Sequence, residues 1–136
     1  MNLELKGCTA VVTGGSRGIG RAVAEELVSS GVSVVIAARN TGGLEKAAKQ
    51  LSVLGTVIPI QADTSNDSSV KKLINSAVSE LGSINILVNC AASVSWREPN
   101  PNIETLEYDE FMRSLNVKVM GYLRCTREVA PLMRKQ

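Results

Sequence analysis

The stretch Thr13-Gly14-Gly15-Ser16-Arg17-Gly18-Ile19-Gly20 decides the fold of this chain. It follows the β-branched apolar run Thr9–Thr13, which is typical of a buried strand. It leads into a helical pattern of Ile19, Val23 and Leu27. A glycine-rich turn is most informative when it joins a strand to a helix in this way. The sequence therefore predicts a strand, a tight turn and a helix in this order.

Three glycines of the turn have a predicted task. Gly14 permits a tight turn, Gly18 lets the backbone approach a pyrophosphate, and Gly20 lets the helix pack closely on the sheet. The exposed N–H groups at the positive end of the helix dipole would bind the pyrophosphate. We predict a dinucleotide-binding turn, whose binding residues are Gly14, Ser16, Arg17, Gly18, Ile19 and Gly20.

Three other interpretations of this turn were weighed. The pattern G-x-S-x-G also fits the nucleophile elbow of α/β hydrolases, but that elbow requires a histidine and the chain has none. The glycine spacing also fits a P-loop, but Arg21-Ala22 stands where Lys-Ser/Thr is required. The third interpretation, a structural turn that binds no ligand, is not excluded by these residues. The absence of histidine also excludes Ser-His-Asp and Cys-His catalysis and histidine-containing zinc sites.

Short apolar runs and helical patterns alternate along the rest of the chain. The further strands are predicted at Ser33–Ala37, Thr56–Ile60 and Ile84–Val88. Apolar faces predict helices through Leu44, Ala47, Ala48, Leu51 and Leu54, and through Val70, Leu73, Ile74, Ala77, Val78 and Leu81. The predicted helix ends are Gly31, Gly55 and Gly82, and the predicted N-cap of the third helix is Ser65 or Asn66.

A long helix is predicted from about Glu104 or Tyr108 to near Gln136. Its apolar side would hold Phe111, Leu115, Val119, Leu123 and Ala130. Alternating strands and helices imply right-handed crossovers and a parallel sheet. The predicted fold class is α/β, a three-layer Rossmann-type doubly wound parallel sheet of strand order 3-2-1-4. Pro59 agrees with an edge position for the third strand, because proline cannot donate to the ladder.

Composition and charge limit the partners. The 136 residues include 15 basic and 13 acidic side chains, a net charge of +2 without runs of like charge. We therefore expect neither nucleic acid nor a membrane as a partner. Because no apolar stretch approaches the roughly 20 residues of a membrane helix, and no signal peptide is evident, we expect a cytoplasmic protein. Cys8, Cys90 and Cys125 are expected to be reduced, mostly buried thiols, and no metal site is predicted.

Polar residues collect just past the carboxyl ends of the predicted strands. They are Gly14–Arg17, Arg39-Asn40, Asp63-Thr64 and Asn89-Cys90-Ala91. Ligands of open α/β sheets bind along this edge. We therefore add Arg39, Asp63, Thr64, Asn89 and Ala91 to the predicted cofactor-binding residues.

Arg39 indicates which dinucleotide is bound. It lies where NAD-dependent enzymes keep an acidic residue for the ribose 2′-hydroxyl. A guanidinium pairs with a 2′-phosphate, which a carboxylate would repel, and Arg17 offers a second cation. The predicted cofactor is NADP(H), with NAD(H) as the alternative. Two solvated surface arginines remain the other interpretation.

The motifs in order resemble the short-chain dehydrogenase/reductase family over essentially the whole chain. Thr13-Gly14-x-x-x-Gly18-Ile19-Gly20 is similar to the family's T-G-x-x-x-G-I-G signature, and Asn89-Cys90-Ala91-Ala92 to its N-N-A-G stretch. Asp63 matches the position that contacts adenine, and Asn116 matches the asparagine of the catalytic tetrad. The resemblance implies hydride transfer between NADP(H) and a small carbonyl or alcohol substrate, in a homo-oligomer. A buried structural asparagine is the alternative for Asn116.

The chain departs from the family in two ways. Cys90 and Ala92 replace the second Asn and the Gly of N-N-A-G. The family's catalytic serine and Y-x-x-x-K are absent, since Tyr108 is followed four residues later by Met112 and Tyr122 by Thr126. Residues 1–136 are therefore interpreted as a single NADP(H)-binding Rossmann domain, truncated at its C-terminus, with an incomplete sheet and no dehydrogenase activity of its own.

Two alternatives to an enzyme's cofactor-binding part stay open. One is a non-catalytic nucleotide-binding protein or partner subunit, and the other is a truncation product without function. The substrate cannot be read from the sequence. Trp96 in the loop after the fourth strand could flank a substrate, and a partly exposed tryptophan without a role is an equal alternative.

Overall fold

Parallel strands form one sheet in the computed structural model of the chain, which describes residues 4–93 and 103–136. The strands are β1 (Thr9–Thr13), β2 (Ser33–Ala38), β3 (Val57–Gln61) and β4 (Ile86–Asn89). Their order is β3-β2-β1-β4, and every neighbouring pair is parallel. The predicted doubly wound order is confirmed, with strand ends that differ from the prediction by one or two residues.

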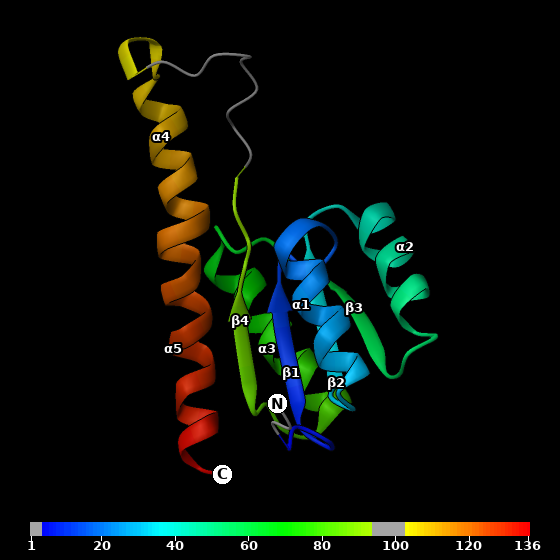
Figure 1. Cartoon of the computed structure of the whole chain (residues 1–136). Coiled ribbons are helices and arrows are strands. Elements are labelled where there is room, and N and C mark those ends of the chain that lie inside the picture. The colour runs from blue at the N-terminus through cyan, green and yellow to red at the C-terminus, as the bar shows by residue number, and fades with distance from the viewer. Residues whose placement is uncertain (1–3, 94–102) are drawn as a thin grey trace.

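Helices cover both faces of this sheet (Figure 1). The helical elements of the chain are α1 (Gly18–Ser29), α2 (Thr41–Leu51), α3 (Asp67–Leu81), the 3-10 turn η1 (Ile103–Thr105), α4 (Tyr108–Leu115), the π-helical turn η2 (Asn116–Met120) and α5 (Gly121–Arg134). Helices α1 and α2 pack on one face, and α3 and α5 pack on the other. This gives the predicted three layers. In the described part of the chain, no helix has the length and apolarity required to cross a bilayer.

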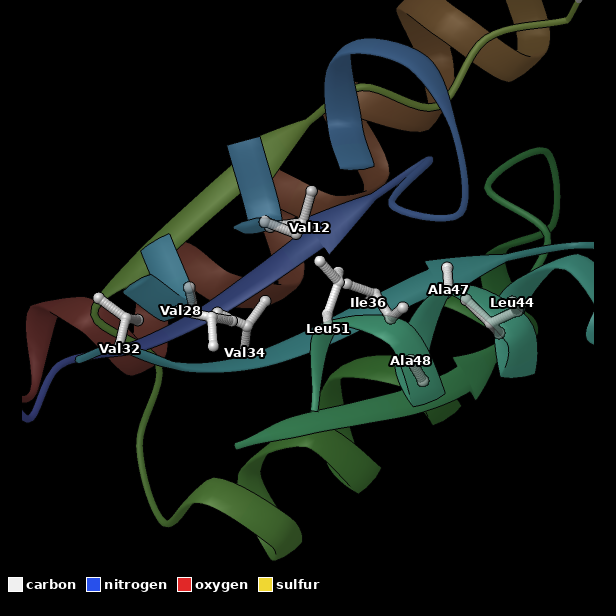
Figure 2. Packing of buried hydrophobic residues seen from close by; sticks show 11 residues of the cluster. Val12, Val28, Val32, Val34, Ile36, Leu44, Ala47, Ala48 and Leu51 are labelled. Carbon is white, nitrogen blue, oxygen red and sulfur yellow. The ribbon is translucent and has the colours of Figure 1, made fainter. Parts of the chain in front are cut away.

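The two faces of the central strands bury alternate side chains. Val12, Val34 and Ile36 point toward α1 and α2, where they meet Val28 and Leu51 (Figure 2). The residues between them, Val11, Val35 and Ala37, pack against α3 and α5. Burial of each valine or leucine side chain contributes about 1.5–3 kcal/mol. Because both faces are covered, the central strands are continuous apolar runs without polar alternation.

Helix boundaries agree with most of the predicted signals. Asn66 caps α3, since its Oδ1 accepts a hydrogen bond from the Ser69 N–H at 2.8 Å. Gly31 and Gly82 follow α1 and α3 with φ of 82° and 78°. The prediction for Gly55 was wrong: α2 ends at Leu51, and Gly55 has no left-handed φ. The apolar pattern had also included Leu54, which is 46% exposed.

Two predicted apolar faces are wrong in part. In α1 the buried residues are Gly20, Ala24 and Val28; of the predicted face, Leu27 packs against this core, whereas Ile19 is 78% exposed. The predicted row of the long helix is largely exposed, including Phe111, Val119 and Leu123. The buried residues there are Val117, Gly121, Cys125 and Val129. The π-turn η2 adds one residue to a turn and so changes which side chains face the sheet.

The outer edge of β3 contains Pro59, as predicted. The Val34 N–H donates to the Thr56 carbonyl, and the Ala62 N–H donates to the Ala38 carbonyl. Since backbone polar groups of successive strand residues alternate in direction, the even-numbered residues of β3 face β2. The nitrogen of Pro59 therefore faces outward, where no ladder hydrogen bond is lost. Strand β4 forms the opposite edge of the sheet.

Candidate cofactor site

The β1–α1 turn is held between β2 and the residues that follow β4. Gly14 has a φ of +70°, and its N–H donates to the Ala37 carbonyl at 2.8 Å. A Cβ at Gly14 would lie 2.6 Å from the Cys90 carbonyl oxygen, which is closer than real contacts allow. The predicted tight turn therefore exists, and only glycine fits it.

The other two glycines of the motif have different surroundings. A Cβ at Gly20 would collide with the Gly14 carbonyl oxygen and lie 3.1 Å from the Cys90 Cβ, so α1 starts in direct contact with the turn. Gly18 has a φ of +56°, and a Cβ there would meet nothing within 4 Å. The turn is thus closely packed on its inner side and open beside Gly18.

The N-terminus of α1 opens onto this space. Its N-cap, Arg17, makes no side-chain capping hydrogen bond, and no acidic residue lies in the first turn. The first N–H groups of a helix have no intrahelical acceptor, and they carry the positive end of the dipole. Arg17, Gly18 and Ile19 are exposed, and Ser16 is half-buried beside them. These residues fit the pyrophosphate of a dinucleotide, because they leave an open, uncapped helix start beside a cation.

Thr13 ties this turn to the segment after β4. Its Oγ1 accepts hydrogen bonds from the N–H groups of Cys90 at 3.2 Å and Ala91 at 3.3 Å, and it donates to the Val88 carbonyl at 3.4 Å. The side chain is 1% exposed. Sequence reasoning treated Thr13 only as part of a motif. A threonine at the end of a buried apolar strand is the signal that would have indicated this bridging role.

Asp63 closes a small turn after β3. Its Oδ1 accepts from the Ser65 N–H at 2.9 Å and the Ser65 hydroxyl at 2.7 Å. Burial alone would raise the pKa of Asp63, but the Ser65 hydrogen bonds and the positive charges of Arg39 and Arg124 lower it overall. The carboxylate is therefore ionised at neutral pH. Its Oδ2 has no hydrogen-bond partner among residues 4–93 and 103–136.

Arg39 lies at the end of β2 with an exposed side chain. Its backbone carbonyl accepts a hydrogen bond from Gln61 Nε2 at 3.0 Å, which ties it to β3. The charge of Arg39 acts on the Asp63 carboxylate, so the two groups lie on the same part of the edge. Arg39, Asp63 and the glycine turn therefore all follow carboxyl ends of neighbouring strands, as the topology requires.

Asn89 is directed toward the helix on the far face of the sheet. Its Nδ2 donates to Thr126 Oγ1 at a long distance of 3.5 Å. Its Oδ1 is buried and has no hydrogen-bond partner in the described part of the chain. An unsatisfied buried amide oxygen costs about 1–3 kcal/mol, which indicates a site where a further donor is expected.

Asn116 lies in the π-turn η2, which contacts the residues that follow β3. The Arg124 guanidinium donates to both its Oδ1 and its backbone carbonyl. Thr64 is 5% exposed, and its hydroxyl donates to the Val117 carbonyl at 3.1 Å. Sequence reasoning missed Arg124 completely. The signal would have been its position three residues after Gly121, on the face of the helix that packs.

The tyrosines differ in their surroundings. Tyr108 is 88% exposed on α4, which extends beyond the carboxyl end of the sheet (Figure 1). Burial and the neighbouring Cys90 raise the pKa of Tyr122 above its usual value near 10, which makes its phenol a weaker acid at neutral pH. The described surroundings of Tyr122 therefore do not bring its phenol pKa toward neutrality, as proton transfer would require. Trp96 lies outside the described residues.

Comparison with known proteins places this geometry in a family. The family model described as short chain dehydrogenase matches residues 8–136. The chain is 36% identical over 131 residues to a short chain dehydrogenase of Pseudocercospora fijiensis, covering 96% of this chain and 42% of the relative. It is 33% identical over 141 residues to the 3-dehydrosphinganine reductase of Danio rerio, covering 98% of this chain and 41% of that protein.

Solved structures give the same result for the fold. The RhlG/NADP complex of Pseudomonas aeruginosa is 30% identical with a TM-score of 0.86, covering 96% of this chain and 50% of that one. L-sorbose reductase of Gluconobacter frateurii, complexed with NADPH and L-sorbose, is 31% identical with a TM-score of 0.88. The match covers 99% of this chain and 51% of that one. The chain thus spans between 41% and 51% of the length of these proteins. Because the family model covers nearly all of its residues, the chain belongs to the short-chain dehydrogenase family.

Proposed function

We propose that this chain supplies the NADP(H)-binding part of an oxidoreductase that acts on a carbonyl or alcohol substrate. One observation carries the proposal: the glycine turn is clamped against Cys90 on its inner side and leaves an uncapped helix start open on the other. An anionic ligand is the group that such a helix start binds. Gly14, Gly18 and Gly20 form the turn, while Ser16, Arg17 and Ile19 border the open side.

The preference for the 2′-phosphorylated cofactor rests on charge. Arg39 is exposed after β2, and Arg17 is exposed at the start of α1. A 2′-phosphate would gain charge-assisted hydrogen bonds from either guanidinium. Asp63 Oδ2, Thr64, Asn89 and Ala91 would complete the cofactor contacts along the same edge. Similar proteins are described in complexes with NADP, with NADPH and, for a ketoacyl reductase of Brucella melitensis, with NADH.

The described residues can bind and orient a dinucleotide, but they lack a group for proton transfer. Hydride exchange with a carbonyl or alcohol carbon is the chemistry that a bound nicotinamide supplies. In residues 1–136 neither tyrosine has a lysine four residues later. Asn116 would be the residue carried over from the family's catalytic set, and Arg124 already occupies its amide oxygen. We expect no NADPH-dependent turnover by residues 1–136 alone.

Calorimetric titration with NADPH and NADH tests the binding proposal. We expect NADPH to bind at least tenfold more tightly, and Arg39→Gln to lower NADPH affinity about tenfold without affecting NADH, since one charge-assisted contact is worth about 1.5–3 kcal/mol. Lys46→Gln is the matched control, because it removes an exposed positive charge from the neighbouring α2. Tighter binding of NADH by the unmodified chain would contradict the proposal.

A second candidate function is a non-catalytic nucleotide-binding protein or partner subunit. It would use the same open, uncapped helix start and would require no proton-transfer group. Turnover assays with NADPH and a panel of ketones and aldehydes would separate the two candidates. Measurable oxidation of NADPH by the purified chain would exclude the non-catalytic function and would also overturn the expectation that residues 1–136 are inactive.

A further inference from the structure

Arg124 is the most extensively bonded side chain between the long helix and the loop after β3. Its side chain is 14% exposed. Nε donates to Asp67 Oδ1, Nη1 donates to the carbonyls of Thr64 and Asn116 at 3.1 Å each, and Nη2 donates to Asn116 Oδ1 at 2.8 Å. Four of the five N–H groups of the guanidinium are thus used. So many directed contacts fix both partners relative to the planar guanidinium.

The contacts on the loop side lead directly to the candidate cofactor residues. Thr64 follows Asp63, whose described side-chain hydrogen bonds both use Oδ1. Besides its carbonyl contact with Arg124, Thr64 donates its hydroxyl to the Val117 carbonyl at 3.1 Å. A Cβ on Gly121 would lie 2.9 Å from the Thr64 side chain, so the helix touches the loop at this point. Arg124 therefore holds the backbone next to Asp63 directly, through the Thr64 carbonyl.

The contacts on the helix side set the orientation of Asn116. Its Oδ1 and its backbone oxygen both point toward Arg124. The Nδ2 group, which is a donor, is then the part of the amide that is turned away from the guanidinium. Arg124 therefore determines which half of the Asn116 amide faces away from the guanidinium.

We infer that Arg124 is a positioning residue, which holds the Asp63–Thr64 loop for the adenine half of the cofactor and fixes the Asn116 amide against the same guanidinium. The inference rests on the proposed NADP(H) binding and adds to it the residue that sets the loop. Arg124 does not itself contact the ligand in this role. Its effect on affinity passes through the backbone of Thr64.

Arg127 provides a matched control on the same helix. Its Nη2 pairs with the same Asp67 Oδ1 at 3.1 Å, but its side chain is 61% exposed. The described contacts of Arg127 include neither Thr64 nor Asn116. Arg124→Met and Arg127→Met therefore remove equal charge from α5, and only the first releases the loop.

The experiment measures binding of NADPH and of 2′,5′-ADP, which lacks the nicotinamide half, to the unmodified chain and both variants. We expect Arg124→Met to weaken both ligands by the same factor, about tenfold for the loss of several hydrogen bonds to one charged group. Arg127→Met should stay within about twofold. Arg124→Lys should recover part of the loss, because an ammonium can replace some of the contacts but not the planar fork.

A measurement without ligand separates this inference from the proposed function. In the unliganded protein, Arg124→Met should shift the Asn116 side-chain amide resonances and speed hydrogen exchange at Ser65, and Arg127→Met should do neither. If the unmodified chain binds neither ligand, the proposed function fails while these resonances still test the arrangement. If it binds both ligands and Arg124→Met binds them as Arg127→Met does, the inference is wrong. Should Arg124→Met fail to fold, Arg124→Lys supplies the same comparison, and unchanged affinity and resonances there would also overturn the inference.

Discussion

The β1–α1 turn and the junction of η2 with α5 each bring a helix against a loop, but by different means. At the turn, Gly14 and Gly20 let backbone meet backbone, and no charged side chain takes part. At the junction, Gly121 meets the Thr64 side chain, and the Arg124 guanidinium binds the surrounding carbonyls. The contact at the turn requires glycine, because any side chain would overlap with backbone atoms. The contact at the junction is made largely by side chains, so substitutions there can weaken it by different amounts.

The largest expected effect is that of Gly14→Ala. The substitution places a Cβ 2.6 Å from the Cys90 carbonyl at a φ of +70°. We expect a loss of roughly 3 kcal/mol in the free energy of unfolding, since strain in the left-handed region adds to the overlap. Urea denaturation measures it. Gly42→Ala in α2 is the control, because a Cβ there has only an ordinary contact of 3.6 Å with Asn40. Equal stability of the two variants would refute the rigidity of the turn.

An intermediate effect is expected at the junction. Gly121→Ala brings a Cβ to 2.9 Å from the Thr64 Cβ and Oγ1 and to 3.2 Å from the Thr64 carbonyl oxygen, but Gly121 has a helical φ of −63°, so no left-handed strain is added. We expect about 1–2 kcal/mol of destabilisation, less than at Gly14. The same denaturation series measures both substitutions. A loss at Gly121 equal to or larger than the loss at Gly14 would show that the two contacts do not differ in rigidity.

The smallest effect concerns the thiols of the two regions. Burial raises the pKa of Cys125, beneath α5, from 9.0 to about 11. Cys90, beside the glycine turn, is only half-buried. We expect iodoacetamide at pH 8 to modify Cys90 and leave Cys125 unreacted in the folded protein, as peptide mass spectrometry would show. Faster modification of Cys125 would contradict its burial.

The same pKa shift predicts a pH dependence with a defined sign. Between pH 9.0 and about 11 the unfolded thiol loses its proton while the folded one keeps it. The folded state then binds more protons, so stability falls as pH rises through this window. Cys125→Ala should flatten that part of the stability profile. An unchanged alkaline slope in this variant would assign the loss to other groups.

The strands and their order could be predicted because they rest on strong local signals. Burial on both faces requires continuous apolar runs, and Pro59 restricts its strand to an edge. The glycine turn could be predicted for a similar reason, since its conformation at Gly14 admits no other residue. In these regions, the local sequence and the tertiary packing impose the same requirement.

The long helix could not be predicted as well, because its pattern misleads. Its apolar row includes Phe111 and Leu123, which are 44% and 57% exposed. The π-turn changes the phase of the helix between α4 and α5, and no local residue signals an extra residue in a turn. The buried face includes the glycine that meets Thr64 and the arginine that binds it, so it lacks the appearance of an apolar face. Arg124 lies on that face, so its contacts could not be predicted once the face itself was predicted wrongly.

Because the nitrogen of Pro59 faces outward, the two edges of the sheet differ in how they could pair with an added strand. A strand added beside β3 would find donors at Val57 and Gln61 and none between them. In β4 the same alternation leaves the N–H groups of Ile86 and Val88 facing outward, because the Asn85 N–H donates to the Thr9 carbonyl on the β1 side. Successive outward donors are therefore uninterrupted along β4, whereas a strand added beside β3 would lose one hydrogen bond at Pro59.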